Sequence, residues 1–383
     1  MERIYYDHAA TTPLHPLAAE AMLAVMQGPP GNASSIHSFG RDARRLVNES
    51  REAIAATLGC KPAEIVFTSG GTEADNMAVR GVMEAQAAAG KRHLITSRVE
   101  HHAVLRECER LERTGIDVTY LPVDESGLIS AEDLKQALRP DTGLVSIIYA
   151  NNETGTVQPI AELAGLAGAA GVPFHTDAVQ AYGKLPIDLA VLPVQLLSVT
   201  AHKINGPHGT GALFVRQGTF LHPLLVGGSQ EKKRRGGTEN LAGIAGFAEA
   251  AKLAAAKLES DALRLDELRR EWIALMDEAA EGGVVVNGHE GKRVPGIVNL
   301  SFPGLDNEAL LMNLDLAGIA ASAGSACTAG ALEPSHVLQA MGLPQERLQT
   351  AIRFSFGLGN TKEEMARAAR KVETFLRRNR NSS

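Results

Sequence analysis

Cysteine and aromatic residues are scarce in this chain. Only three cysteines occur among 383 residues (Cys60, Cys108 and Cys327), and aromatic side chains make up 4% of the sequence. A sparse, odd-numbered set of cysteines argues against a disulfide framework in a chain of this length and favours a reducing compartment. We therefore expect free thiols and a cytoplasmic location.

Long apolar runs and an excess of positive charge are also absent. No apolar stretch approaches the ~18 residues of a membrane span, and the first residues lack the apolar core of a signal peptide. The net charge is −6, so electrostatics give no reason to expect nucleic acid or an anionic membrane as a partner. The composition is otherwise that of a globular enzyme.

The chain does contain a repeated alternation of short apolar runs and helical stretches. The β-rich runs are residues 64–69, 93–97, 117–123, 144–150, 172–177 and 195–200. Apolar runs of this length, separated by helices, predict βαβ units with a mostly parallel sheet. Residues 210–216 follow Lys203 too closely for a helical crossover, so we expect an antiparallel strand there.

The last third of the chain has a different pattern. Its β-rich runs are fewer, at residues 296–302 and 351–356, and Thr361 and Glu364 have capping-box spacing at the last helix. One helix presents an apolar face made of Leu265, Leu268, Trp272, Leu275 and Ala279. Because 383 residues exceed the ~250–300 at which single cores stop growing, we expect a large α/β domain and a smaller α+β domain.

The motif "TSGGTEADN", residues 68–76, predicts a strand end, a glycine turn and a helix start. Thr72 and Asp75 have the spacing of a capping box. Glycines let backbone N–H groups approach an anion at a helix N-terminus, which favours negative charge. The motif is therefore compatible with a phosphate cradle; taken alone, an ordinary βα turn is the more common reading.

Two further motifs place reactive side chains after buried strands. In "HTDAVQAYGK", Asp177 ends a strand at the edge where ligands of α/β folds bind, with Gln180 in the following turn; Asp177 could equally cap the next helix. In "SVTAHKINGPHGTG", Lys203 follows Thr200 and His202, two groups able to contact phosphate. A lysine held beside a bound cofactor can lose its proton and react with an aldehyde.

Together these motifs predict a pyridoxal phosphate (PLP) site. A phosphate cradle, a carboxylate for the pyridine nitrogen and a lysine for the aldehyde occur in one chain. The "EHHAV" motif adds His101 and His102, whose adjacency is wrong for a helical metal pair. His101 could stack on a planar cofactor, or the two could be a surface pair. Cys108 shares a predicted helix face with Val104 and Leu111, which indicates a core thiol.

The sequence resembles the NifS/IscS family of cysteine desulfurases, within the class V aminotransferase group, and its wording is closest to the NifS branch. The resemblance runs essentially end to end. It rests on the motifs "YYDHAATTP", "GNASSIHSFG", "FTSGGTEADN", "EHHAV", "ANNETGTVQPI", "HTDAVQA", "AHKINGPHGTG", "RRGGTEN", "SAGSACTAGALEPSHVLQAMG" and "IRFSFG". Thr200 and Ala323 stand where many relatives have serine, and neither change removes a needed group.

The resemblance implies the PLP fold type I, with a mostly parallel seven-stranded sheet in a large domain. That domain would span residues 16–259. The smaller α+β domain would combine residues 1–15 with 260–383 and carry a mobile cysteine loop at about 322–333. Each PLP would lie at a boundary between two subunits of a homodimer.

The resemblance also implies roles for individual residues. Lys203 would bind the cofactor covalently, His101 would stack on its ring and transfer protons, and Cys327 would accept sulfur. The other implied cofactor contacts are Gly71, Thr72, Asn151, Asp177, Gln180, Thr200, His202 and, from the neighbouring subunit, Thr238. The implied substrate contacts are Asn32, Asn151 and Arg353.

The implied reaction converts L-cysteine to L-alanine and leaves a persulfide on Cys327, within the small-residue stretch "SAGSACTAG". The sulfur would pass to an iron–sulfur scaffold or another acceptor protein. No intrinsic metal is expected, although Cys327 could transiently ligate a cluster with a scaffold partner. The alternatives are an aminotransferase or selenocysteine lyase of the same fold, or a non-catalytic scaffold, which would tolerate loss of Lys203 or Cys327.

Overall fold

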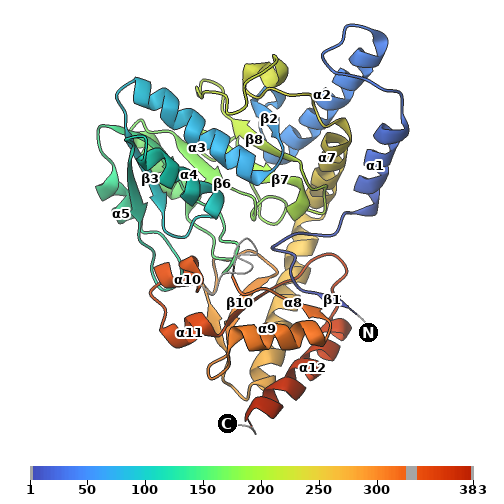
Figure 1. Ribbon diagram of the computed structural model, residues 1–383, viewed down its shortest axis with the longest axis vertical. Coiled ribbons are helices and arrows are strands. Elements are labelled where there is room, and N and C mark those ends of the chain that lie inside the picture. Colours follow the sequence, from blue (N-terminus) through green and yellow to red (C-terminus); the bar gives the residue numbers. More distant parts are fainter. Residues whose placement is uncertain (1–2, 325–333, 381–383) are drawn as a thin grey trace.

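A seven-stranded sheet occupies the upper part of the molecule in Figure 1, in the order β2-β8-β7-β6-β5-β3-β4. The computed structural model describes residues 3–324 and 334–380. The strands are β2 (Ile65–Thr68), β3 (His93–Ser97), β4 (Asp117–Leu121), β5 (Thr142–Ser146), β6 (Phe174–Asp177), β7 (Leu196–Thr200) and β8 (Gly211–Val215). β8 runs antiparallel to β2 and β7, and the pairs among β7, β6, β5, β3 and β4 are parallel. The predicted sheet and its antiparallel strand are confirmed.

Helices cover both faces of this sheet. One face packs against α3 (Gly71–Ala88) and α4 (His102–Glu112), and the other against α2 (Ser38–Leu58), α6 (Ile160–Ala169) and α7 (Leu241–Ala256). Side chains alternate along a strand, so neighbouring residues pack on opposite faces of the sheet. In β2, Val66 packs on the side of α3 and Phe67 on the side of α2. Cys108 is fully buried on the α3 side, as predicted.

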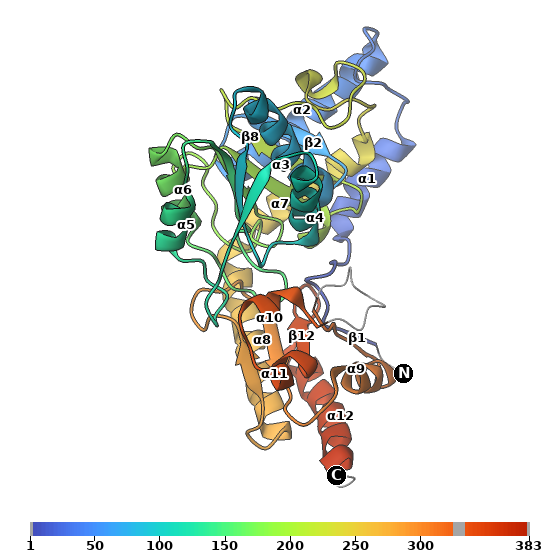
Figure 2. The same ribbon diagram turned by 60° about the vertical axis from the view of Figure 1, so that its left-hand side comes forward.

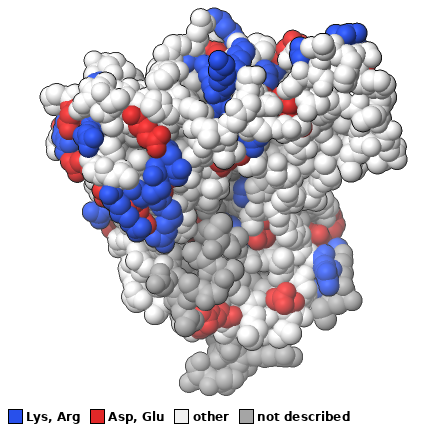
Figure 3. Space-filling model, turned by 45° about the horizontal axis from the view of Figure 1, so that its top comes forward, with Lys and Arg blue, Asp and Glu red and all other residues white. Residues whose placement is uncertain are grey.

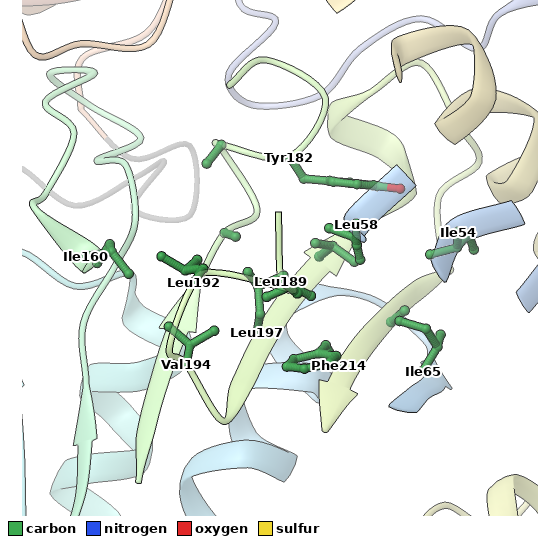
Figure 4. Close-up of a cluster of buried hydrophobic side chains, with 14 of the residues drawn as sticks. Ile54, Leu58, Ile65, Ile160, Tyr182, Leu189, Leu192, Val194, Leu197 and Phe214 are labelled. Atoms are coloured by element: carbon green, nitrogen blue, oxygen red, sulfur yellow. The ribbon is translucent and has the colours of Figure 1, made fainter. Parts of the chain in front are cut away.

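The α2 side forms the larger apolar core, part of which Figure 4 shows. Ile54 and Leu58 of α2 point toward Ile65 and Phe214 on the strands, and Leu197 of β7 lies between them and Val194. Two further helices complete this part of the chain, α1 (Pro16–Gln27), which packs on α7, and α5 (Ala131–Ala137), which packs on α6. Short 3₁₀ segments are η1 (Pro62–Glu64), η2 (Ala201–Lys203) and η3 (Gln230–Lys233).

The C-terminal third builds a second core beneath the first, as Figure 2 shows. Its sheet has the order β12-β10-β9, from β9 (Val285–Asn287), β10 (Ile297–Ser301) and β12 (Ala351–Ser355). The helices are α8 (Leu258–Ala279), α9 (Asn307–Leu316), α10 (His336–Ala340), α11 (Gln345–Gln349) and α12 (Lys362–Arg380). On α8, the predicted apolar face is confirmed at Leu265, Leu268, Trp272 and Ala279, while Met276 is fully buried and Leu275 only partly.

The N-terminal residues join this second core. β1 (Ile4–Tyr5) pairs in parallel with β11 (Ile319–Ala320), and Tyr6 packs against Trp272 of α8 with ring centroids 5.0 Å apart. The predicted strands did not include β1, β9 or β11, which are too short to give a periodic signal. The grouping supports the division into residues 16–259 and residues 1–15 plus 260–383, and we propose it as the domain boundary.

Charges of both signs mix on the face shown in Figure 3, where Lys and Arg gather at one side with Asp and Glu among them. Among the described residues, no helix combines the length and the apolar character that a membrane crossing needs.

Candidate active site

A cavity of about 190 Å³ lies at the carboxyl ends of the parallel strands, between the sheet and β12. Most of the predicted site residues line it. They are Gly71, Thr72, His101, Asp177, Gln180, Thr200, His202, Lys203 and Arg353. Residues more than 250 positions apart in the sequence therefore line the same cavity.

The N-terminus of α3 forms one end of the cavity. The helix begins at Gly71, where an added Cβ would lie 2.8 Å from Cγ2 of Val179, so a larger residue would displace the Val179 side chain. Thr72 and Asp75 do not form the predicted capping box, because the helix starts one residue before Thr72. Glu73 instead accepts a hydrogen bond from the Ser69 N–H (2.8 Å). The helix N-terminus still faces the cavity, as an anion site needs.

Thr200 and His202 stand beside this helix end. Thr200 is buried and donates its hydroxyl to the Thr210 carbonyl (3.1 Å). The His202 ring stacks on His208 at 5.3 Å, and its Nδ1 lies 3.1 Å from the Thr11 hydroxyl. Burial, followed by the charge of Lys203, lowers the pKa of His202 to about 3. The ring is therefore neutral and can donate one N–H to an anion.

Lys203 is the last residue of η2, directly after β7. Its Nζ donates to the backbone carbonyls of Ala9 (2.5 Å) and Ala10 (2.6 Å). The N-terminal segment, which carries no predicted role, thus holds the predicted nucleophile at the cavity. Carbonyl acceptors hold the amine in place without the full charge that a carboxylate partner would bring.

Asp177 ends β6 and is 4% exposed. Its Oδ1 accepts from the Val179 N–H (2.9 Å), so it caps the following turn while also lining the cavity. The predicted helix cap is replaced by this turn contact, because the next element after β6 is the strand β7, and the role of Asp177 toward a pyridine nitrogen stays a prediction. Burial raises the pKa of Asp177, and the charges of His101 and Lys203 act in the opposite direction.

Two further buried carboxylates lie near Asp177. Burial and the charge of Asp177 raise the pKa of Asp75 well above its usual value, and Oδ1 of Asp75 has no hydrogen-bond partner. Burial raises the pKa of Glu100 to about 8. Asp75 lines the cavity and was given no site role from the sequence.

His101 precedes α4 as its N-cap. Its Nδ1 accepts from the Ala103 N–H (3.1 Å). The proton of the neutral imidazole is therefore on Nε2, and the cap fixes the ring's orientation at the cavity.

Arg353 lies on β12 and is 1% exposed. Its Nη2 pairs with Asp7 (2.7 Å) and its Nη1 donates to the Asn152 carbonyl (3.0 Å). Nε is buried without a hydrogen-bond partner. A guanidinium with an unused donor at a cavity wall is suited to a carboxylate ligand.

Three predicted residues, Asn151, Asn32 and Thr238, do not line this cavity. The Asn151 side chain donates to the Val99 carbonyl (3.0 Å) and accepts from Glu153 and Thr154, while its neighbour Asn152 lines the wall. Asn32 and Thr238 are exposed. Cys327 lies outside the described residues. The roles of all four stay predictions.

The residues that the sequence analysis missed contribute mainly through backbone. Ala9 and Ala10 line the cavity and hold Lys203 by their carbonyls, for which no side-chain pattern exists. The motif "YYDHAATTP" was the available signal, although it gave no role for these residues.

The residues present fit PLP. An amine at Lys203 suits its aldehyde, a buried carboxylate at Asp177 suits its pyridinium nitrogen, and the α3 N-terminus with His202 suits its phosphate. Two polar atoms of the lining residues have no hydrogen-bond partner among the described residues, Oδ1 of Asp75 and Nε of Arg353. Among residues 3–324 and 334–380, no three His, Cys, Asp or Glu side chains group in a way that could hold a metal ion.

The model of the aminotransferase class-V family matches residues 4–367. The chain belongs to this family. A "Putative cysteine desulfurase IscS 1" of Bacillus subtilis is 51% identical over 382 residues, 99% of this chain and 100% of that one. The "Cysteine desulfurase IscS" of Methanosarcina thermophila is 45% identical over 385 residues, 99% of this chain and 93% of that one.

Solved structures agree. A "NifS-like protein" superposes with a TM-score of 0.92 at 35% identity, covering 98% of this chain and 99% of that chain. "SspA in complex with cysteine" gives 0.82 at 36% identity, covering 92% and 98%. The predicted resemblance to cysteine desulfurases of the NifS/IscS kind and the predicted fold class are confirmed.

Proposed function

We propose that this class-V family member is a PLP-dependent cysteine desulfurase that converts L-cysteine to L-alanine and leaves a persulfide on Cys327. The observation that carries the proposal is one cavity that contains the Lys203 amine, the buried Asp177 carboxylate and the Arg353 guanidinium. Relatives named cysteine desulfurase match nearly the whole chain, and one of the similar solved structures is titled as a complex with cysteine.

Asp177 and the α3 N-terminus would hold the two ends of PLP, and Lys203 would bind its aldehyde. When bound, PLP withdraws electrons from the substrate's α-carbon and so weakens the bonds to it. The pKa of Asp177 is raised by burial, so a cationic ring nitrogen beside it would stabilise the ionised carboxylate.

Arg353 would bind the carboxylate of the amino acid. Its free Nε lies in a buried environment, where a charge-assisted hydrogen bond contributes most. Asp7 and the Asn152 carbonyl fix the guanidinium from the other side, so the fork is held in place before substrate arrives.

His101 and Lys203 would move the protons. His101 presents Nε2 to the cavity because Nδ1 is used as a helix cap. Lys203 would hold a proton at Nζ, where the carbonyls of Ala9 and Ala10 accept its N–H groups.

The Cys327 thiolate would attack the sulfur of the substrate, so that an S–S bond forms as the Cβ–S bond breaks. The electron pair of the broken bond would stay on the carbon skeleton, which takes up protons to become alanine, and the sulfur would remain on the enzyme as a persulfide. An iron–sulfur scaffold or another acceptor protein would then receive it. We further propose a homodimer in which the exposed Thr238 contacts the phosphate of the neighbouring subunit's PLP, which sedimentation with and without PLP would test.

The decisive experiment compares Cys327→Ser with Cys60→Ser after incubation with L-cysteine. We expect the wild type and Cys60→Ser to carry a persulfide on Cys327, detected by peptide mass spectrometry, and to form alanine. Cys327→Ser should keep PLP but form almost no alanine. Alanine formation at the wild-type rate in Cys327→Ser would contradict the assigned nucleophile, and pyruvate or amino-group transfer in its place would indicate a different PLP reaction.

A further inference from the structure

Lys184 is a partly buried cation next to the cavity that the proposed chemistry does not use. Its Nζ donates to Oε1 of Gln180 (2.8 Å). The other end of the same amide, Nε2, donates to the Ala9 carbonyl (2.8 Å), which also accepts from Lys203 (2.5 Å). One hydrogen-bonded chain therefore runs from Lys184 through Gln180 to the backbone that holds Lys203.

The turn after β6 places the Lys184 side chain next to the Gln180 amide. The Tyr182 N–H donates to the Ala178 carbonyl (2.8 Å) and the Leu185 N–H to the Ala181 carbonyl (2.9 Å), so the turn has helical spacing and residues four apart lie together. Gly183 has φ +70°, and an added Cβ would lie 2.7 Å from Cγ2 of Ile204. Only glycine fits there, and the position of the Lys184 side chain depends on it.

The two partners of the amide determine its orientation. A lysine nitrogen donates whether or not it is protonated, and a backbone carbonyl only accepts. Oε1 must therefore face Lys184, and the NH₂ group must face Ala9. One N–H is used on Ala9, and the second remains on a side chain that is 3% exposed and lines the cavity.

Lys184 forms no ion pair with a described carboxylate. Burial, followed by the charges of Lys203 and Arg353, lowers its pKa to about 7. A second cavity of about 80 Å³ is lined by Lys184 and Lys203, and also by Lys257, Asp261 and Arg264. Burying an amine beside two like charges costs free energy, and the hydrogen bond to Gln180 offsets part of that cost.

We propose that Lys184 is a positioning residue that fixes the Gln180 amide so that its free N–H points at the ring oxygen of bound PLP. This rests on the proposed function, in which Gln180 contacts that ring. Without Lys184 the amide would be held only at Ala9, so its plane would be less firmly fixed and its second N–H would point less consistently at the cofactor.

The test uses the PLP-loaded enzyme and the variants Lys184→Met, Lys184→Arg, Gln180→Ala and the double variant. We expect Lys184→Met to lose PLP about tenfold faster on dialysis, the usual effect of one hydrogen bond to a charged or strongly polar group. It should shift the visible absorbance of bound PLP in the same direction as Gln180→Ala. Lys184→Arg should restore both, and the double variant should match Gln180→Ala alone.

Controls separate positioning from structural support. Lys257→Met removes an exposed lysine that lines the same second cavity and should leave PLP loss unchanged. Urea unfolding at a large excess of PLP should show no loss of stability in Lys184→Met, because one buried like charge is gone; Lys184→Leu repeats the comparison if the methionine variant does not fold.

Two results would overturn the inference. One is a wild-type spectrum and PLP loss rate in Lys184→Met, and the other is an additive effect in the double variant. A chain that holds no PLP on Lys203 in any form would instead overturn the proposed function, so the two failures are distinguishable.

Discussion

The acidic and cationic walls of the cavity differ in how their charges are held. On the acidic wall, Asp177 and Asp75 face the cavity with Glu100 close to Asp177, and burial raises the pKa of all three. On the cationic wall, formed by His202, Lys203 and Arg353 with Lys184 behind, burial and mutual repulsion lower the pKa values of His202 and Lys184.

The walls are not isolated from each other, because the charges of Lys203 and His101 act on Asp177 and Asp7 pairs with Arg353. Repulsion remains between Asp75 and Asp177 and among Lys184, Lys203 and Arg353. PLP with an amino acid would bring a cation to the first group and anions to the second. A bound ligand should therefore stabilise the charged residues of this cavity. Substitutions that remove one of these charges should reduce ligand binding and turnover more than the free energy of unfolding.

The largest effect is expected from Lys203→Ala, which removes the reactive amine of the cationic wall. Covalent PLP attachment and desulfuration should be lost. Borohydride reduction followed by peptide mapping should find the pyridoxyl group on Lys203 in the wild type and nowhere in the variant. An adduct on Lys184 would show that the wrong lysine has been assigned.

The next largest effect is a difference in kcat between substitutions at Asp177 and at Asp75, the two carboxylates of the acidic wall. Asp177→Asn removes the charge that a ring nitrogen needs and should reduce kcat on the order of 10²–10³-fold, as for loss of one preorganised electrostatic partner. Asp75→Asn should cost much less, because burial and the charge of Asp177 raise the pKa of Asp75 and so already disfavour a charge on that carboxyl. Steady-state alanine formation measures both, and equal losses would refute the distinction.

Arg353→Lys tests the cationic wall at its substrate end. It keeps the charge beside Asp7 but removes the fork, so KM for L-cysteine should rise about 10- to 100-fold, the range expected for hydrogen bonds to a charged group. PLP retention should stay at the wild-type level. A change in PLP retention without a change in KM would place Arg353 on the cofactor instead.

The smallest effect concerns stability and pH. The pKa of Glu100 is raised to about 8 in the folded protein, above its ordinary value of about 4.3, so folding takes up a proton between these values and stability falls as pH rises through this window. Glu100→Gln should therefore unfold at a higher temperature than the wild type, with a gain that grows from about pH 5 to pH 8. The exposed Glu52→Gln should show no such growth; a constant offset would contradict the shift.

The large sheet and the main chemistry of the site were predictable from sequence. Apolar runs gave β3 and β7 closely, and the position of Lys203 after β7 placed its amine at the ligand edge of the sheet. Asp177 was found for the same reason. The positions of these residues could be predicted because the hydrophobic pattern of a strand and the place where it ends depend on residues close together in the sequence.

The rest depended on contacts that no local pattern contains. Carbonyls of Ala9 and Ala10 act through backbone, and β1 and β11 are two residues each. Lys184 stands in the quoted motif "HTDAVQAYGK", but its contact with Gln180 follows from the turn at Gly183 and from Ala9 on the amide's other side. The N-terminal start of α3 at Gly71 was likewise decided by packing on Val179.

The contact of the N-terminal segment with β12 joins the two cores beside the cavity. Asp7 holds Arg353, and the Ala9 N–H donates to the Ser355 hydroxyl (2.8 Å), across 346 residues. The same segment is bonded to the loops of the large sheet, because Gln180 and Lys203 both donate to the Ala9 carbonyl. Any movement of one core against the other would therefore be transmitted to the backbone that holds Lys203.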